Sequence, residues 1–246
     1  MMGTMQAPAL PDLVHGTADD LAAASLSLAR HFSAGATMWC VAPDWPSHGR
    51  HVAVEFVHPV IVGKRALPSV SVDGPDVAAG LRQLVRPGDV LLVVSAADTV
   101  GVTDLLLRAG AWGLLSLWLG AGPRPVSPRA DHTVWLEAAD PVVAARGGDM
   151  VLLYHLLWEL THVVLEHRGL IDEPEPAACA DDVCVTCSDE GRITEVRAVL
   201  DNGLVEVVSE GRAERVDASL VDAPVPGSLL LVHAGVAISE IRGEAP

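Results

Sequence analysis

Two cysteines and a histidine in the last quarter of the chain have the types and spacing that could hold a transferable group. Cys184 and Cys187 stand in the sequence Cys-Val-Thr-Cys, and His233 lies near the end of the same β-patterned segment. A thiolate is a soft metal ligand, and an exposed cysteine is easier to ionise and to present to a partner than a buried one. The segment is too short to enclose an active-site cleft, so these residues indicate a carrier or a docking surface.

Two other interpretations of these residues stay open. Cys184 and Cys187 could form half of a structural zinc site, which needs two further nitrogen or sulfur ligands. They could also form a redox pair, although the strand-then-helix context of thioredoxin-like motifs is missing. His233, flanked by valine and by Ala-Gly, could be an ordinary hydrogen-bonded structural residue.

Composition narrows the class of protein. The 246 residues carry 32 acidic and 16 basic side chains, a formal net charge of −16. Binding to nucleic acids or to anionic membranes depends on clustered lysine and arginine, so we expect neither. The longest apolar stretch, residues 150–165, is interrupted by His155, Glu159 and His162, which favours a buried helix over a membrane span. Four cysteines and an N-terminus without signal-peptide features favour a reduced, cytoplasmic protein.

The first 171 residues alternate between strand-like and helix-like patterns. We expect strands at 37–42, 68–72, 89–95, 112–119 and 133–136, and helices at 19–32, 48–57, 75–84, 100–109 and 147–167. The strand at 89–95 is almost continuously apolar, which indicates burial on both faces. Residues 1–171 are therefore predicted to form an α/β domain with a parallel sheet flanked by helices.

A second, smaller domain is expected after an acidic linker at residues 172–183. The linker sequence contains two prolines and several acids and shows no apolar periodicity. Residues 184–246 contain β-rich runs at 192–199, 204–209, 213–220 and 228–232, separated by turn sequences such as Asp-Asn-Gly and Pro-Gly. This pattern predicts a small OB-like β-barrel.

The C-terminal domain resembles the hydrogenase formation chaperones of the HypC/HupF family across nearly all of residues 184–241. The resemblance is carried by Leu-Val-His-Ala-Gly-Val-Ala-Ile at 231–238, by Pro-Gly-Ser at 226–228 and by the strand-like run at 216–221. It implies a [NiFe]-hydrogenase maturation chaperone that carries an iron group between a HypD-like maturation scaffold and the hydrogenase large-subunit precursor. The leading cysteine's role falls on Cys184, with Cys187 and His233 completing the iron-carrier site.

The chain departs from that family in two respects. The family's cysteine follows the initiator methionine, whereas Cys184 is internal and can reach a partner only if the linker is flexible. An apolar-proline pair usually follows the family's cysteine, whereas this chain has Ser188-Asp189 after Cys187.

The N-terminal domain resembles the SIS (sugar isomerase) family, in particular its sedoheptulose-7-phosphate (phosphoheptose) isomerase branch, over about residues 18–168. The order of elements agrees, including the apolar strand ending at Ser95 and the long final helix. The resemblance implies that His51, Glu55 and His155 bind a divalent metal such as zinc and transfer protons. The i, i+4 spacing places His51 and Glu55 on one helix face. The three residues could also be relics or a buried hydrogen-bonded cluster.

The phosphate-binding loops of that family are degraded in this chain. Residues 42–47 and 95–100 replace the family's glycine- and serine-rich loops, and Ser47, Ser95 and Thr99 are the hydroxyls that remain. Two prolines remove backbone donors from the first loop, and Asp98 adds a carboxylate to the second. Ordinary sugar-phosphate isomerase activity is therefore not expected.

Two functions follow from these observations. The preferred one is a hydrogenase maturation chaperone with a degenerate SIS domain for oligomerisation or ligand sensing. The alternative is a metal-dependent, isomerase-like enzyme that acts on a small sugar-type metabolite. Since SIS domains usually associate through helices, a homodimer or tetramer is expected.

Overall fold

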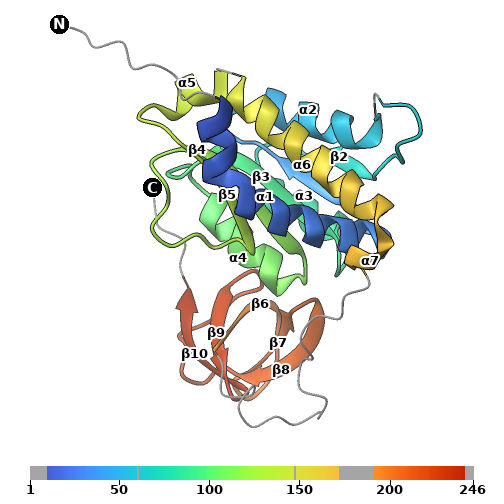
Figure 1. Cartoon of the computed structure of the whole chain (residues 1–246). Helices are drawn as coiled ribbons and strands as arrows, with labels where there is room; N and C mark the ends of the chain where they lie inside the picture. Colours follow the sequence, from blue (N-terminus) through green and yellow to red (C-terminus); the bar gives the residue numbers. More distant parts are fainter. Residues whose placement is uncertain (1–9, 60, 147, 172–190, 242–246) are drawn as a thin grey trace, which may run out of the picture.

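A parallel sheet and a closed barrel form the two parts of the molecule (Figure 1). The computed structural model describes residues 10–59, 61–146, 148–171 and 191–241. The predicted linker at 172–183 therefore lies outside the described residues.

The N-terminal part contains five strands in the order β2-β1-β3-β4-β5. All neighbouring pairs are parallel, as the sequence predicts. Every residue of the central strand β3 is buried, because helices cover both faces of the sheet. The strands are β1 (Met38–Val41), β2 (Ser69–Ser71), β3 (Val90–Ala96), β4 (Leu115–Gly122) and β5 (His132–Glu137).

Side chains alternate along β3 between two apolar cores. Val90, Leu92 and Val94 join the core beneath α1, α2 and α6, whereas Leu91 and Val93 join the core beneath α3 and α4. Figure 1 shows α1, α2 and α6 together over one face of the sheet and α4 on the other side. The helices are α1 (Leu10–Ser33), α2 (Pro46–Val57), α3 (Val77–Leu84), α4 (Val102–Ala111), α5 (Pro141–Arg146), α6 (Asp149–Glu166) and α7 (Arg168–Ile171).

Two short helices, α5 and α7, are not predicted from the sequence. Helix α5 has only six residues, too few for an apolar period to show. Its first turn is fixed by Asp140, whose Oδ1 accepts hydrogen bonds from the backbone N–H groups of Val142 and Val143 at 2.9 and 3.2 Å. A side-chain cap of this kind can define a helix that periodicity does not reveal.

The C-terminal part is a closed barrel of five strands in the order β10-β8-β7-β6-β9. The β8–β10 pair is parallel, and the other pairs are antiparallel. Eight buried apolar residues, including Val196, Val207 and Leu230, fill its interior. The strands are β6 (Arg192–Val199), β7 (Leu204–Ser209), β8 (Arg212–Asp217), β9 (Leu229–His233) and β10 (Val236–Ile241).

One predicted strand, at 213–220, extends too far. Strand β8 ends at Asp217 because the Asp217 carboxylate accepts a hydrogen bond from the Ser219 backbone N–H at 2.8 Å. This local turn replaces the ladder hydrogen bonds that would continue the strand.

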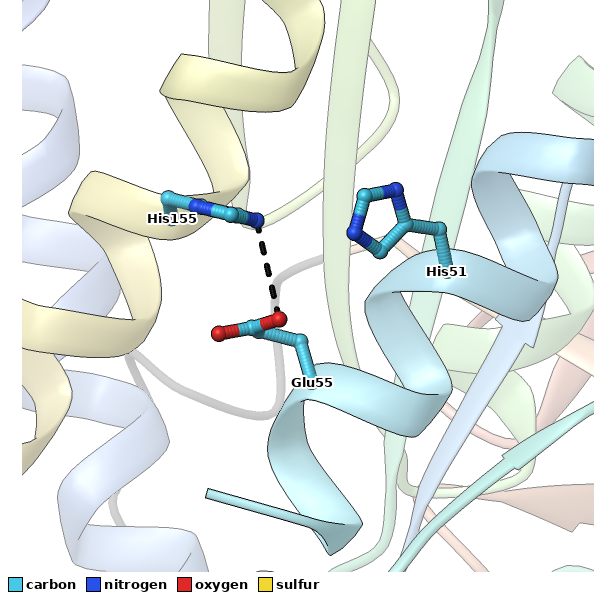
Figure 2. Close-up of side chains that lie close together, drawn as sticks. All are labelled: His51, Glu55 and His155. Carbon is cyan, nitrogen blue, oxygen red and sulfur yellow. Dashed lines mark ion pairs between the residues drawn. The ribbon is translucent and has the colours of Figure 1, made fainter. Parts of the chain in front are cut away.

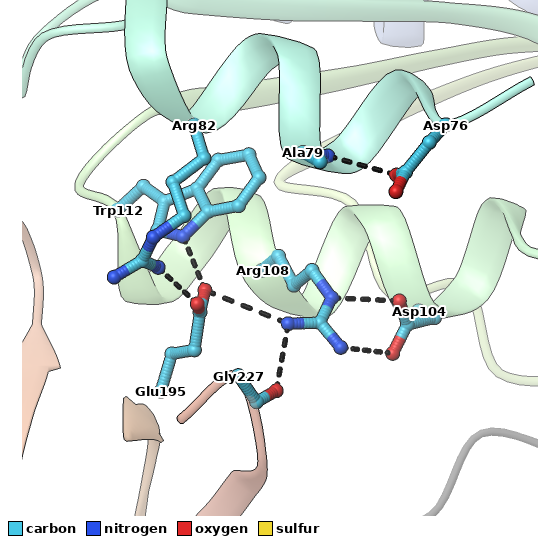
Figure 3. A network of polar contacts seen from close by, with 8 residues as sticks. All are labelled: Asp76, Ala79, Arg82, Asp104, Arg108, Trp112, Glu195 and Gly227. Atoms are coloured by element: carbon cyan, nitrogen blue, oxygen red, sulfur yellow. Dashed lines mark hydrogen bonds and ion pairs between the residues drawn. The ribbon is translucent and has the colours of Figure 1, made fainter. Parts of the chain in front are cut away.

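A buried ion-pair network joins the barrel to helices α3 and α4 (Figure 3). Glu195 of β6 is 1% exposed, and its carboxylate pairs with Arg82 of α3 and with Arg108 of α4. The indole N–H of Trp112 also donates a hydrogen bond to this carboxylate. Arg108 also donates to the carbonyl oxygen of Gly227, at 2.9 Å. The two parts of the chain are therefore held together by fixed polar contacts.

Close backbone approach adds to this contact. The Gly211 N–H, in the β7–β8 turn, donates to the carbonyl oxygen of Ala111 at 2.9 Å. A Cβ atom on Gly113 would lie 2.8 Å from the Glu210 carbonyl group, and one on Gly211 would lie 2.4 Å from Pro87. Both glycines also have positive φ angles, so larger residues would separate the barrel from α4.

Among the helices that the structure describes, none is both long and apolar enough to cross a membrane.

Candidate functional site

Three predicted metal ligands meet between helices α2 and α6. His51 and Glu55 lie one turn apart on α2, and His155 faces them from α6 (Figure 2). One potential ligand atom from each residue lies within 4.8 Å of the others. The His155 Nε2 atom is 3.6 Å from the Glu55 Oε2 atom. The fold thus brings together Glu55 and His155, which are 100 positions apart in the sequence.

The donor set fits a divalent ion such as zinc. Two imidazoles and a carboxylate are common zinc ligands, and three protein ligands leave a fourth position open. The His155 Nε2 atom is buried and has no hydrogen-bond partner among the described residues. Buried nitrogen atoms normally have a hydrogen-bond partner. The His155 Nε2 atom is therefore suited to bind a metal ion together with the Glu55 carboxylate.

Tyr154 lies against the same cluster. Its hydroxyl oxygen is 2.8 Å from the Nδ1 atom of His51, and the two rings meet edge to face. Burial and the negative charge of Glu55 raise the pKa of the Tyr154 phenol, so its proton stays on the oxygen. Sequence reasoning missed this residue. The signal was available, because Tyr154 is the only tyrosine of the chain and its hydroxyl needs a partner inside an apolar helix.

The remaining hydroxyls of the degraded phosphate loops are engaged or displaced. Ser95 is fully buried, donates to its neighbouring carbonyl and accepts a hydrogen bond from the Trp118 indole at 2.8 Å. Ser47 is exposed in the first turn of α2. Thr99 donates to a carboxylate oxygen of Asp44, and the backbone N–H of Ala96 donates to the same oxygen at 3.4 Å. The chain's own carboxylate therefore occupies donors that an external anion would need.

We expect the protein to bind inorganic phosphate or a sugar phosphate more weakly than about 1 mM. The Asp44 carboxylate already accepts the available hydrogen bonds and would repel a dianion. Isothermal titration calorimetry with phosphate and with a pentose or heptose phosphate measures this directly. Sub-millimolar binding to the unmodified chain would show that the loop still forms an anion site.

The predicted carrier site in the C-terminal part is described only in part. Cys184 and Cys187 lie outside the described residues. His233 is the last residue of β9, pairs with Val236 of β10 and is partly buried. On the neighbouring strand, Arg192 pairs with Val232, so the chain enters β6 beside His233.

The one described cysteine, Cys40, does not take part in any of these sites. It is fully buried in β1 within the core beneath α2. Burial raises the pKa of its thiol, which keeps the sulfur neutral and unreactive.

An interdomain cavity of about 650 Å³ lies beside the Glu195 network. Its lining includes Arg82, Arg108 and Glu195. Both arginines already form ion pairs with Glu195. These charged groups therefore stabilise the interface and are not available for a ligand.

Comparison with known structures shows the fold of the N-terminal part. A phosphoheptose isomerase from Francisella tularensis superimposes with a TM-score of 0.54 at 12% identity, covering 62% of this chain and 90% of that one. Two further matches are the sugar isomerase domain of an RpiR transcription factor from Sphaerobacter thermophilus (TM-score 0.49, 17% identity, 65% and 87% coverage) and phosphoheptose isomerase GmhA from Neisseria gonorrhoeae (0.47, 16%, 59% and 85%).

The α/β domain thus has the fold of SIS-type sugar isomerases, as the sequence resemblance predicts. At this level of identity the similarity concerns the fold alone. No protein-family model matches the sequence, and no curated protein is significantly similar to it.

Proposed function

We propose that this protein is a [NiFe]-hydrogenase maturation chaperone whose OB-like barrel carries an iron group to a partner. The barrel's strand order supports the proposal most strongly. In chain order the strands pair 1-2-3-5-4 and close on strand 1, with strands 3 and 5 parallel, and this closed five-stranded barrel supports the proposed OB-like assignment. The signature residues 231–238 form the β9–β10 hairpin of this barrel.

The position of His233 supports a role beside the two cysteines. Gly191 is the described residue that precedes β6, and the register of β6 and β9 places it next to His233. Cys187 is four residues earlier, a stretch that spans at most about 14 Å, and Cys184 is at most about 25 Å of chain away. In the proposed site, both thiols are within reach of His233 along the chain.

The two ends of β9 differ in their relation to the interdomain cavity. Leu229, at one end of β9, lines the interdomain cavity, whereas His233, at the other end of this strand, is not among the lining residues. A partner can approach the His233 end of this strand without displacing the interface around Glu195. The iron group would be bound by the Cys184 thiolate, a soft ligand suited to iron, with Cys187 and His233 beside it.

The proposed partners are a HypD-like maturation scaffold, which supplies the iron group, and the precursor of the hydrogenase large subunit, which receives it. The SIS-type domain would orient the barrel and support a homodimer or tetramer or sense a ligand. The net charge of −16 favours partners with basic surfaces.

Affinity purification of the full chain from its native host tests this proposal. We expect a maturation scaffold or a large-subunit precursor among the co-purifying proteins, identified by mass spectrometry. Repeated recovery of sugar-metabolising enzymes without either protein would argue against the assignment.

The second candidate function is metal-dependent, isomerase-like chemistry on a small sugar-type metabolite in the α2–α6 pocket. The observation that favours it is the buried His155 Nε2 atom, which lacks a hydrogen-bond partner and faces Glu55. When bound, a divalent metal would polarise a substrate oxygen. Since Asp44 occupies the phosphate loop, the substrate would be a metabolite without a phosphate group.

Metal binding itself can be measured. We expect about one zinc ion per chain after reconstitution, and at least a tenfold loss of zinc affinity in a His155→Ala variant, because one of three protein ligands is removed. Elemental analysis after dialysis gives the stoichiometry. His167→Ala is a suitable control, since His167 follows the same helix and lies outside the cluster. Equal zinc content in all three proteins, or none in the unmodified chain, would contradict the site.

A further inference from the structure

A chain of polar contacts runs from the backbone of α5 to the metal-ligand cluster. The His48 Nε2 atom is 2.9 Å from the Ala145 carbonyl oxygen. The His48 Nδ1 atom is 3.5 Å from the Tyr154 hydroxyl oxygen, which is 2.8 Å from the His51 Nδ1 atom. Two side chains, His48 of α2 and Tyr154 of α6, thus connect this backbone carbonyl group to His51 of the cluster.

The partners at the start of this series fix the direction of the hydrogen bonds. A carbonyl oxygen can only accept, so the His48 Nε2 atom carries a proton and donates. Burial lowers the pKa of His48, so the imidazole is neutral and its Nδ1 atom has a free lone pair. At 3.5 Å, that lone pair can accept a hydrogen bond from the Tyr154 hydroxyl group.

The next contact follows from the first two. When the Tyr154 hydroxyl group donates to His48, its oxygen is left to accept a hydrogen bond from the Nδ1–H group of His51. A neutral His51 protonated at Nδ1 has its remaining lone pair on Nε2. Figure 2 shows the His51 ring turned so that one nitrogen faces the space between Glu55 and His155. The Nδ1 atom is taken by Tyr154, so this nitrogen is Nε2.

We propose that Tyr154 and His48 are positioning residues that hold His51 in the Nδ1-protonated tautomer, so that its Nε2 lone pair is directed at a metal ion shared with Glu55 and His155. The inference rests on the metal site of the second candidate function. Partners that fix the tautomer and ring orientation of a histidine ligand commonly contribute roughly 10- to 100-fold to metal affinity.

The decisive experiment uses the full chain with Tyr154→Phe, which removes only the hydroxyl group. Thr161→Val is the matched control, because it removes another buried hydroxyl of α6 whose hydrogen bond goes to Leu157. Two quantities are measured at neutral pH. The first is the pair of ring nitrogen shifts of His51 in the metal-free protein, by two-dimensional 15N NMR, and the second is the zinc affinity, by competition with a chromogenic chelator.

In the unmodified chain and in Thr161→Val we expect a protonated Nδ1 and an unprotonated Nε2 atom on His51. In Tyr154→Phe we expect the two tautomers to mix and the zinc affinity to fall by about tenfold or more. His48→Gln, which alters the preceding contact, is expected to change the His51 shifts in the same direction by a smaller amount.

Failure of this inference can be distinguished from failure of the metal site. The NMR measurement is made without metal, so it tests the tautomer even if the chain binds no zinc. A His51 protonated at Nε2 in the unmodified chain, or His51 shifts that are identical in Tyr154→Phe, would overturn the inference. Zinc binding at unchanged affinity in Tyr154→Phe would do so as well, while leaving the metal site intact.

Discussion

Replacement of Cys184 by alanine is expected to abolish hydrogenase maturation while the purified chain stays folded. The proposed function assigns the iron group to the thiolate of this residue, and alanine offers no ligand atom. Cys184 precedes the first barrel strand by eight positions, and the described core of the barrel consists of residues between Val196 and Ala237. The stability of both parts should therefore be unaffected.

The measurement is hydrogenase activity in a host strain that lacks the gene and is complemented with each variant. Cys184→Ala is expected to give the activity of the uncomplemented strain. Ser188→Ala, on the same segment, serves as the matched control and should restore full activity. Cys187→Ala should reduce activity less than Cys184→Ala, since the leading cysteine's role falls on Cys184. Full activity with Cys184→Ala would remove the carrier role from this residue.

Glu195→Ala is expected to cause the largest loss of stability of any substitution at the interface between the two domains. The change leaves Arg82, Arg108 and the Trp112 indole without their shared carboxylate (Figure 3). Removal of one member of a buried ion pair costs about 3–5 kcal/mol. We expect about 3 kcal/mol, because the Arg82 side chain is 33% exposed and water can solvate part of its charge.

Urea unfolding gives the free-energy change, and hydrogen exchange of the barrel amides shows where protection is lost. The control is Asp73→Ala, which breaks an exposed ion pair with Arg50 and should cost less than about 1 kcal/mol. Glu195→Gln keeps the size and hydrogen-bonding capacity of the side chain and should fall between the two. If Glu195→Ala costs no more than Asp73→Ala, the network does not hold the barrel in place.

The sequence predicts the α/β domain well because its signals are local. The apolar run at 89–95 corresponds to β3, and the helical pattern at 147–167 corresponds to α6. Strand β3 lies at the centre of the sheet and α6 packs on one face of it, so the apolar pattern of each element matches its burial. Helix α5 and the end of β8 depend on single aspartate side chains that accept backbone N–H groups, and apolar patterns do not report such contacts.

Of the candidate site, only the three metal-ligand residues could be predicted, and this prediction used the resemblance to the SIS family. His51 and Glu55 are neighbours on one helix, and the SIS resemblance adds His155. The role of Asp44 could not be predicted, because it contacts Thr99 across 55 residues of sequence. The same holds for Glu195, whose partners Arg82 and Arg108 belong to another domain. Pairings of this kind depend on how the elements are arranged in space.

The interface between the two domains fixes the orientation of the barrel to which the proposed function assigns the carrier role. The Glu195 network and the close contact of Gly113 with Glu210 fix the barrel against α4. If the barrel has the proposed carrier role, it would therefore present its surface to a partner in one orientation relative to the α/β domain. A partner would meet a barrel of defined orientation.

The iron content of the chain purified without oxygen from its native host tests the central claim most directly. Our account predicts about one iron per chain in the unmodified protein and in Ser188→Ala, and none in Cys184→Ala. Zinc in place of iron, or the same amount of iron in Cys184→Ala, would contradict the claim that this thiolate carries the iron group.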